Sequence, residues 1–204
     1  MATTRSDVTR MGILKDTSLC VACYACRVAC QNHNGLSAEQ TNISLKFREK
    51  GTFPNVEYHL ARKSCMHCAA APCVSACPTR ALHVNAKGFV NYVNDTNDAC
   101  IGCRFCITAC PFDVPKISDG KMYKCTGCEG LISAGQEPAC VDTCIANALH
   151  YGTMEELIVK ANQRLEKIRT KYPNANLYSV TEQGGLGTLL ILRINADEFP
   201  LTGE

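Results

Sequence analysis

Sixteen cysteines, about one residue in thirteen, constrain this chain of 204 residues more than any other feature. They fall into four groups of four, and no cysteine is left over. The first and third groups have the spacing C-x2-C-x2-C-x3-C, whereas the middle gap widens to four residues in the second group and to eleven in the fourth. The groups are Cys20, Cys23, Cys26 and Cys30; Cys65, Cys68, Cys73 and Cys77; Cys100, Cys103, Cys106 and Cys110; and Cys125, Cys128, Cys140 and Cys144.

Such a cysteine content indicates either a disulfide framework or metal sites. Disulfide-rich domains are usually short secreted chains, whereas this chain is long. Residues 1–7 have no apolar run behind a basic start, and Arg5 and Arg10 are not adjacent, so no secretory or twin-arginine signal is visible. Most of the cysteines stand three residues apart, which is the spacing of metal ligands. We therefore expect metal sites.

The spacing distinguishes zinc from iron–sulfur clusters. A zinc site takes two close C-x2-C pairs, and a third cysteine two residues further on has no place in it. In two-cluster ferredoxins the run C-x2-C-x2-C-x3-C-P supplies three thiolates to one cubic cluster, and its fourth cysteine ligates the other cluster. The third group matches this run through Pro111, whereas the first has Gln31 after its last cysteine. The pattern predicts four [4Fe–4S] clusters, with a zinc-stabilised interaction module as an alternative.

Four cysteines per cluster close every iron corner, which favours electron transfer over catalysis at an open iron. We expect no catalytic residue, and no nucleotide-binding G-x-G-x-x-G motif is present. His67, inside the second group, is interpreted as a spacer or hydrogen-bond donor. Arg27, Arg104 and Lys124 stand next to ligands, where they either tune the cluster potentials or are simply solvated. A row of several clusters is useful for carrying electrons between two remote redox sites. We therefore expect a partner protein at each end of the row.

The charge and hydropathy of the chain exclude two classes of partner. The formal net charge is +2, and four thiolate-bound clusters would bring it to about −6. No basic run is long enough to indicate nucleic-acid binding. The longest apolar run, near Leu189–Leu192, is far shorter than the ~20 residues of a membrane helix. We expect neither nucleic acid nor a direct membrane span.

Short strands are predicted between the cysteine groups. Alternating apolar residues predict strands at Ile43–Phe47 and at Val56–Leu60. Residues 82–84 and 89–93 flank Asn85–Gly88, which is typical of a hairpin turn. We expect small two-stranded pieces around the metal sites and no large sheet.

One ordinary helix is predicted in the cysteine-free tail. Thr153 and Glu156 match a capping box, apolar residues recur at helical spacing up to Ile168, and Pro173 ends the helix. A Gly-rich turn and a strand over 188–194 follow. We interpret this tail as packing or docking structure.

The four groups with these gaps, including the x4 and the x11, resemble the iron–sulfur (beta) subunit of the DMSO-reductase family of molybdopterin oxidoreductases, over roughly residues 12–152. The tail is more similar to formate dehydrogenase beta subunits. The resemblance implies an α+β fold of two interlaced bacterial-ferredoxin-like 2[4Fe–4S] units with small two-stranded sheets and short helices, plus a C-terminal helix and strand extension. The outer unit would comprise 12–60 with 120–152, the inner unit 61–119, and the docking tail 153–204.

The family also implies interlaced ligation, in which the last cysteine of one group completes the cluster of another. The implied sets are Cys20, Cys23, Cys26 and Cys144 (first site); Cys125, Cys128, Cys140 and Cys30 (second site); Cys65, Cys68, Cys73 and Cys110 (third site); and Cys100, Cys103, Cys106 and Cys77 (fourth site).

The same resemblance implies a non-catalytic subunit of an enzyme complex. A large molybdenum- or tungsten-pterin catalytic subunit would lie at one end, and a membrane quinone or haem subunit, or a soluble carrier, at the other. Formate dehydrogenase is favoured, with thiosulfate, polysulfide, DMSO and arsenate reductases as alternatives. The chain would be peripheral at the cytoplasmic membrane through its partners, on a side that the sequence does not decide. A free-standing soluble polyferredoxin serving several enzymes is the competing interpretation.

Overall fold

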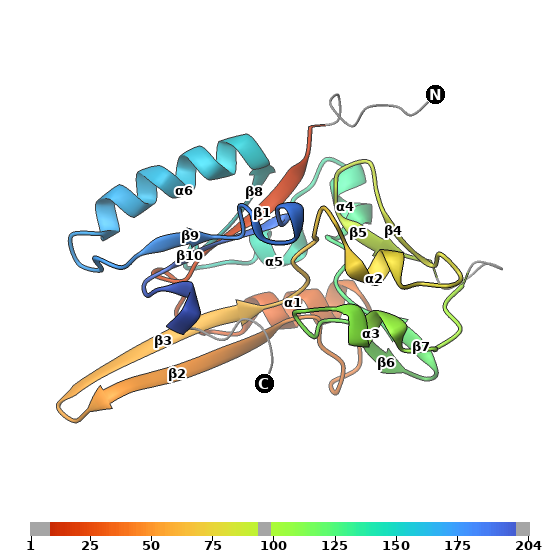
Figure 1. Ribbon diagram of the computed structural model, residues 1–204, viewed down its shortest axis with the longest axis horizontal. Helices are drawn as coiled ribbons and strands as arrows, with labels where there is room; N and C mark the ends of the chain where they lie inside the picture. The colour runs from red at the N-terminus through yellow and green to blue at the C-terminus, as the bar shows by residue number, and fades with distance from the viewer. Residues whose placement is uncertain (1–8, 94–98, 199–204) are drawn as a thin grey trace.

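A computed structural model describes residues 9–93 and 99–198 of the chain. Residues 1–7, considered above for targeting signals, and the last six residues of the tail lie outside this description. A four-stranded sheet stands at the centre, with one long helix across one face and the short helices of the cysteine groups at the other side (Figure 1). The helices are α1 (Ala25–His33), α2 (Pro72–Ser75), α3 (Phe105–Ala109), α4 (Glu129–Ser133), α5 (Ala139–Asp142) and α6 (Met154–Ile168), with 3-10 turns η1 (Glu182–Gly184) and η2 (Ala196–Glu198).

The central sheet joins the two ends of the described chain. Its strand order is β8-β1-β10-β9, and β1 pairs in parallel with β10 and antiparallel with β8. The prediction of two-stranded pieces alone is therefore wrong here. Strand β10 is a buried apolar run after Thr188, and β1 is buried from Gly12 to Asp16 although it carries two charged residues. Neither strand therefore shows the alternation that marks a half-exposed strand. The strands are β1 (Met11–Asp16), β8 (Leu149–Thr153), β9 (Asn176–Tyr178) and β10 (Thr188–Leu192).

Strand β10 separates two apolar clusters because its successive side chains point to opposite faces of the sheet. Leu189 and Ile191 pack with the buried face of α6. Leu190 and Leu192 pack with a second cluster that contains cysteines of the second and third groups. The cysteine-free tail is thus part of the wall against which the cysteine loops are built.

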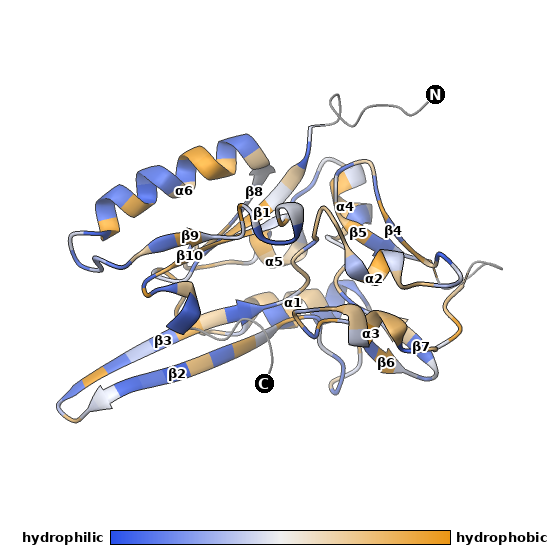
Figure 2. Ribbon diagram, in the orientation of Figure 1, coloured by the Kyte–Doolittle hydropathy of each residue, from blue (hydrophilic) through white to orange (hydrophobic). Residues whose placement is uncertain are grey.

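Helix α6 confirms the predicted capping box. The Thr153 hydroxyl accepts from the Glu156 backbone N–H at 3.2 Å, and the Glu156 carboxylate accepts from the Thr153 N–H at 3.1 Å. Its buried residues are Leu157, Ala161, Leu165 and Ile168, spaced for one face, and hydrophobic and hydrophilic residues alternate along the ribbon in Figure 2.

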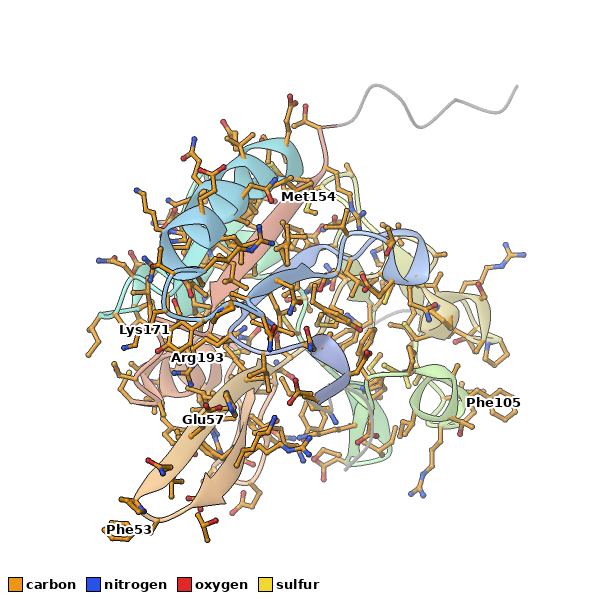
Figure 3. The ribbon with its side chains drawn as sticks, turned by 60° about the vertical axis from the view of Figure 1, so that its left-hand side comes forward. Phe53, Glu57, Phe105, Met154, Lys171 and Arg193 are labelled. Atoms are coloured by element: carbon orange, nitrogen blue, oxygen red, sulfur yellow. The ribbon has the colours of Figure 1, made fainter. Side chains whose placement is uncertain are left out.

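Three hairpins complete the fold. The predicted strand pairs are present, and a third pair near residue 120 was not predicted. The longest hairpin extends from the body, and Phe53 at its tip is 90% exposed (Figure 3). The pairs are β2 (Ser44–Thr52) with β3 (Asn55–Lys63), β4 (Leu82–Val84) with β5 (Val90–Tyr92), and β6 (Lys116–Ser118) with β7 (Lys121–Tyr123).

Candidate iron–sulfur cluster sites

The loops of all four cysteine groups share one backbone feature. The second residue after the first cysteine is left-handed in every group, with φ of 56° at Ala22, 48° at His67, 72° at Gly102 and 75° at Gly127. This conformation turns backbone N–H groups toward sulfur: Gly102 N–H donates to Cys100 Sγ at 3.4 Å, and Gly127 N–H donates to the sulfur of the first cysteine of its own group, also at 3.4 Å. Hydrogen bonds of this kind stabilise thiolates that carry negative charge.

All sixteen cysteines are free thiols. Two of the implied sets surround cavities. One cavity is lined by the four cysteines of the first site, together with Lys15 and Arg62. Another is lined by the four cysteines of the fourth site, together with Met122. Cysteines from distant parts of the sequence therefore line the same cavity.

For the other two sets, the relevant observation is which cysteine charges act on the pKa of a given thiol. Burial raises the pKa of the Cys30 thiol to about 12, and the charges that add most to this shift are those of Cys125, Cys140 and Cys128. These are the members of the second site.

Burial likewise raises the pKa of the Cys68 thiol to about 12, and the next contributions come from Cys65, Cys110 and Cys73. These are the members of the third site. The charges that act most on Cys30 and on Cys68 thus belong to the sets implied for them.

His67 acts as a hydrogen-bonding residue, as its position suggested. It is 1% exposed, and its Nδ1 accepts from the Val90 N–H at 3.1 Å. Because Nδ1 is the acceptor, Nε2 carries the proton, and it lies 3.6 Å from Cys125 Sγ. Burial, with the charge of Lys124 next, holds the pKa of His67 well below its usual value, so the ring is neutral. A residue of the second cysteine group thereby bonds a ligand of the fourth.

The cations that the sequence placed near ligands differ in their surroundings. Lys124 is 2% exposed, and its ammonium donates to the carbonyls of Val90 at 2.5 Å and Cys125 at 2.7 Å. Arg104 is exposed and Arg27 is only half-buried, so Lys124 is the strongest candidate of the three for tuning a cluster.

Two further buried cations, Lys15 and Arg62, were not predicted. Arg62 stands three residues before Cys65 and Lys15 stands five residues before Cys20, but nothing in the mixed sequence of their strands marks either side chain as buried. Arg62 Nε is buried and has no hydrogen-bond partner within the described structure. An unpaired buried donor is costly, and here it lines the cavity of the first site.

The donor set and its surroundings fit [4Fe–4S] clusters. In residues 9–93 and 99–198, no three His, Cys, Asp or Glu side chains are grouped as ligands of a single metal ion would be. The thiols of the first and fourth sites instead line cavities, and backbone N–H groups donate to Cys100 and Cys125. Clusters with four thiolate ligands require this arrangement.

The first and fourth sites reach the surface. Cys23 is exposed, and the apolar side chains beside the first site are open to solvent: Val21 (65%), Val28 (53%) and Ile145 (77%). Beside the fourth site, Ile101 is 66% exposed and Phe105 is 59% exposed. Phe105 projects away from the body at the edge of the molecule in Figure 3. The ligands of the second and third sites are mostly buried.

None of the helices in the described part of the chain has the length and apolar character that a membrane span requires.

Comparison with known proteins gives consistent matches. A family model for a 4Fe-4S dicluster domain matches residues 56–154. The chain is 35% identical over 200 residues to the formate dehydrogenase-O iron–sulfur subunit of Escherichia coli, which covers 88% of this chain and 65% of that protein. It is 34% identical to the iron–sulfur subunit of nitrate-inducible formate dehydrogenase of the same organism, covering 91% and 68%. It is 37% identical to protein NrfC of Escherichia coli, covering 78% and 72%. The chain thus spans just under two thirds of the first of these relatives.

Proposed function

Because this chain belongs to the family of [4Fe–4S] iron–sulfur subunits that includes those of formate dehydrogenases, we propose that it relays electrons through four clusters within a molybdopterin oxidoreductase complex. The observation that carries the proposal is the presence of sixteen free cysteines, with exposed apolar side chains beside those of the first, third and fourth groups. When bound, a [4Fe–4S] cluster supplies one-electron redox chemistry.

The proposed order of the sites is first, second, third, fourth. Helix α1 carries Cys26 and Cys30, so it joins the first site to the second. Burial raises the pKa of the Cys125 thiol most, and the charge of Cys65 makes the next largest contribution. This contribution indicates that the second and third sites are neighbours. Helices α2 and α3 pack against each other and join the third site to the fourth.

The proposed ligand pairing is the interlaced one. Its support is the pair of cavities lined by complete sets of the first and fourth sites, and the electrostatic grouping of the other two sets. In the interlaced scheme, the two cysteines that lie in or just beyond each of α1, α2, α3 and α5 serve neighbouring clusters, which keeps successive clusters close. Close spacing is what a relay needs, since electron hopping falls steeply with distance.

The chain's own residues hold the thiolates and control their surroundings. Backbone amides donate to ligand sulfurs in the loops, and Met122 N–H adds a second donor to Cys100 at 3.3 Å. Asn34 Nδ2 lies 3.5 Å from Cys30 Sγ, and Asn42 Nδ2 lies 3.9 Å from it. Such donors make a site easier to reduce.

The proposed partners are a large molybdenum- or tungsten-pterin catalytic subunit at one end and a membrane quinone or haem subunit, or a soluble carrier, at the other. Formate is the favoured substrate of the complex because two of the matched relatives are formate dehydrogenase subunits by name. The exposed apolar side chains around both end sites support docking, since exposed apolar groups of this kind mark protein contacts. The chain would be held at the cytoplasmic membrane through these partners.

Cluster content and native size test the proposal directly. Protein isolated without air is expected to hold about sixteen iron and sixteen sulfide per chain, and to elute with larger subunits from a native extract. Elution near 22.2 kDa with full clusters would favour a free polyferredoxin over a subunit. Zinc in place of iron and sulfide would end the cluster proposal.

The pairing is tested by a matched pair of substitutions, Cys144→Ser and Cys30→Ser. Each is expected to damage one cluster and to release its other three thiols for alkylation in the native protein. Interlaced ligation predicts that Cys144→Ser releases the first three cysteines of the first group and that Cys30→Ser releases the first three of the fourth. Peptide mass spectrometry identifies the alkylated residues, and the reverse pattern would refute interlacing.

A further inference from the structure

Two buried cations meet in the interior of the molecule. Lys15, on β1, and Arg62, on β3, are 2% and 6% exposed. The Lys15 ammonium donates to Ser64 Oγ at 2.8 Å, and Arg62 Nη1 donates to the same oxygen at 3.1 Å. Burial, and next the charge of Arg62, lower the pKa of Lys15 to about 7, so two full positive charges on one hydroxyl require negative charge nearby. We call Lys15 and Arg62 the cationic pair.

No carboxylate compensates the cationic pair within the described residues. The ion pairs of that part of the chain use other cations, and the buried Asp16 beside Lys15 in sequence is bound to Arg164 at 2.8 Å. Arg62 also keeps a buried Nε–H with no acceptor. An uncompensated buried guanidinium, which stays charged at any ordinary pH, is strongly destabilising. Its surroundings must therefore provide negative charge when the protein is complete.

The sulfurs of two cluster sites surround the cationic pair. Lys15 and Arg62 both line the cavity of the first site. Arg62 also lowers the pKa of all four thiols of the second site, opposing the effect of burial on each of them: Cys30, Cys125, Cys128 and Cys140. In return, the charges of Cys140, Cys26 and Cys125 outweigh burial and raise the pKa of Arg62. The guanidinium lies between the first and second sites.

We propose that the cationic pair is the internal counter-charge of the first and second clusters, and that the free Nε–H of Arg62 donates to a sulfur of the first cluster. The inference rests on the four-cluster function proposed above. A cation stabilises the more negative, reduced state, so the pair raises the reduction potentials of these two clusters relative to the other two. It also offsets the repulsion between two neighbouring negative clusters, which keeps both reducible in the same molecule.

The test is a potentiometric titration of the complete, cluster-loaded chain, followed by electron paramagnetic resonance. In Arg62→Gln, two of the four reduction potentials are expected to fall by at least about 59 mV, which for one electron is a tenfold change in the ratio of reduced to oxidised cluster. Arg48→Gln, which removes the same charge from an exposed position on the partner strand β2, is the control and should move none of them comparably. Unchanged potentials in an Arg62→Gln variant with full iron would overturn the inference.

Arg62→Lys and Lys15→Met separate charge from hydrogen bonding. Arg62→Lys keeps the charge without the Nε–H, so the second site should recover its potential while the first stays lowered. Lys15→Met should lower the same two reduction potentials. Four unchanged potentials in this variant would remove Lys15 from the proposal. If Arg62→Gln loses iron, loss confined to the first and second sites and rescued by Arg62→Lys supports the inference. Equal loss in both variants overturns it. Fewer than four clusters in the unsubstituted chain would instead defeat the proposed function.

Discussion

The two faces of the central sheet are stabilised in different ways. On one face, α6 is a capped helix of 15 residues whose apolar side chains pack on Leu189 and Ile191. On the other face, the cysteine groups contribute helices of four to nine residues and loops with left-handed residues. Cysteines of the second and third groups pack with Leu190, and Cys30 and Cys140 pack with Ile13. Helices this short are not stable without tertiary support. The α6 face has ordinary apolar packing, whereas the cysteine face needs its clusters.

Removal of the clusters should give the largest difference between the two faces. Chelation of iron under reducing conditions leaves sixteen thiols around unfilled spaces and a cationic pair without counter-charge. Hydrogen exchange is therefore expected to become at least tenfold faster in α1, α2, α3 and α5, whereas α6 and β10 keep most of their protection. Mass spectrometry of peptides before and after chelation makes the measurement. Equal loss of protection in α6 would mean that the clusters support the whole fold.

Two adjacent leucines on β10 test the difference between the two faces of the sheet with a smaller expected effect. Leu189→Ala and Leu190→Ala each remove a fully buried side chain, so each should lower the free energy of unfolding by about 2–5 kcal/mol. Only Leu190 contacts the cluster of residues that includes Cys65, Cys68 and Cys73. Leu190→Ala should therefore also speed the loss of iron from the third site to a chelator, while Leu189→Ala should not.

Urea unfolding without air and the decay of visible absorption with chelator measure the two effects separately. A Leu189→Ala variant that released iron as fast as Leu190→Ala would contradict a division at β10. Each variant serves as the control of the other because the residue type, strand and depth of burial are the same.

Local sequence patterns predicted individual helices, turns and strands of this fold, but not how distant strands pair. The capping box at Thr153 and the turn at Asn85–Gly88 depend on neighbours in the chain, and both are confirmed. The pairing of β1 with β10 depends on strands more than 170 residues apart, and short apolar runs do not specify a partner. The sheet was missed for that reason.

The candidate sites, too, could be predicted only where the signal is local in the sequence. Spacing identified the cysteines, and glycine at Gly102 and Gly127 is consistent with the left-handed turn found there. Ala22 and His67 adopt the same turn without any such signal. The burial of the cationic pair could not be predicted, because lysine and arginine are rarely buried and much of their counter-charge comes from cysteines far away in sequence, Cys125 and Cys140 among them.

The smallest predicted effect concerns the cap of α6. Thr153→Ala removes the hydroxyl that accepts from Glu156 N–H, which should lower the free energy of unfolding by about 1 kcal/mol. Thr170→Ala, just beyond the other end of the same helix, removes an exposed hydroxyl and should change it by less than about 0.5 kcal/mol. Because the cap lies on the cysteine-free face, iron content and all four reduction potentials should stay as in the unsubstituted chain. A Thr153→Ala variant with lowered iron content would show that the two faces are coupled through β8, the strand that ends at this cap.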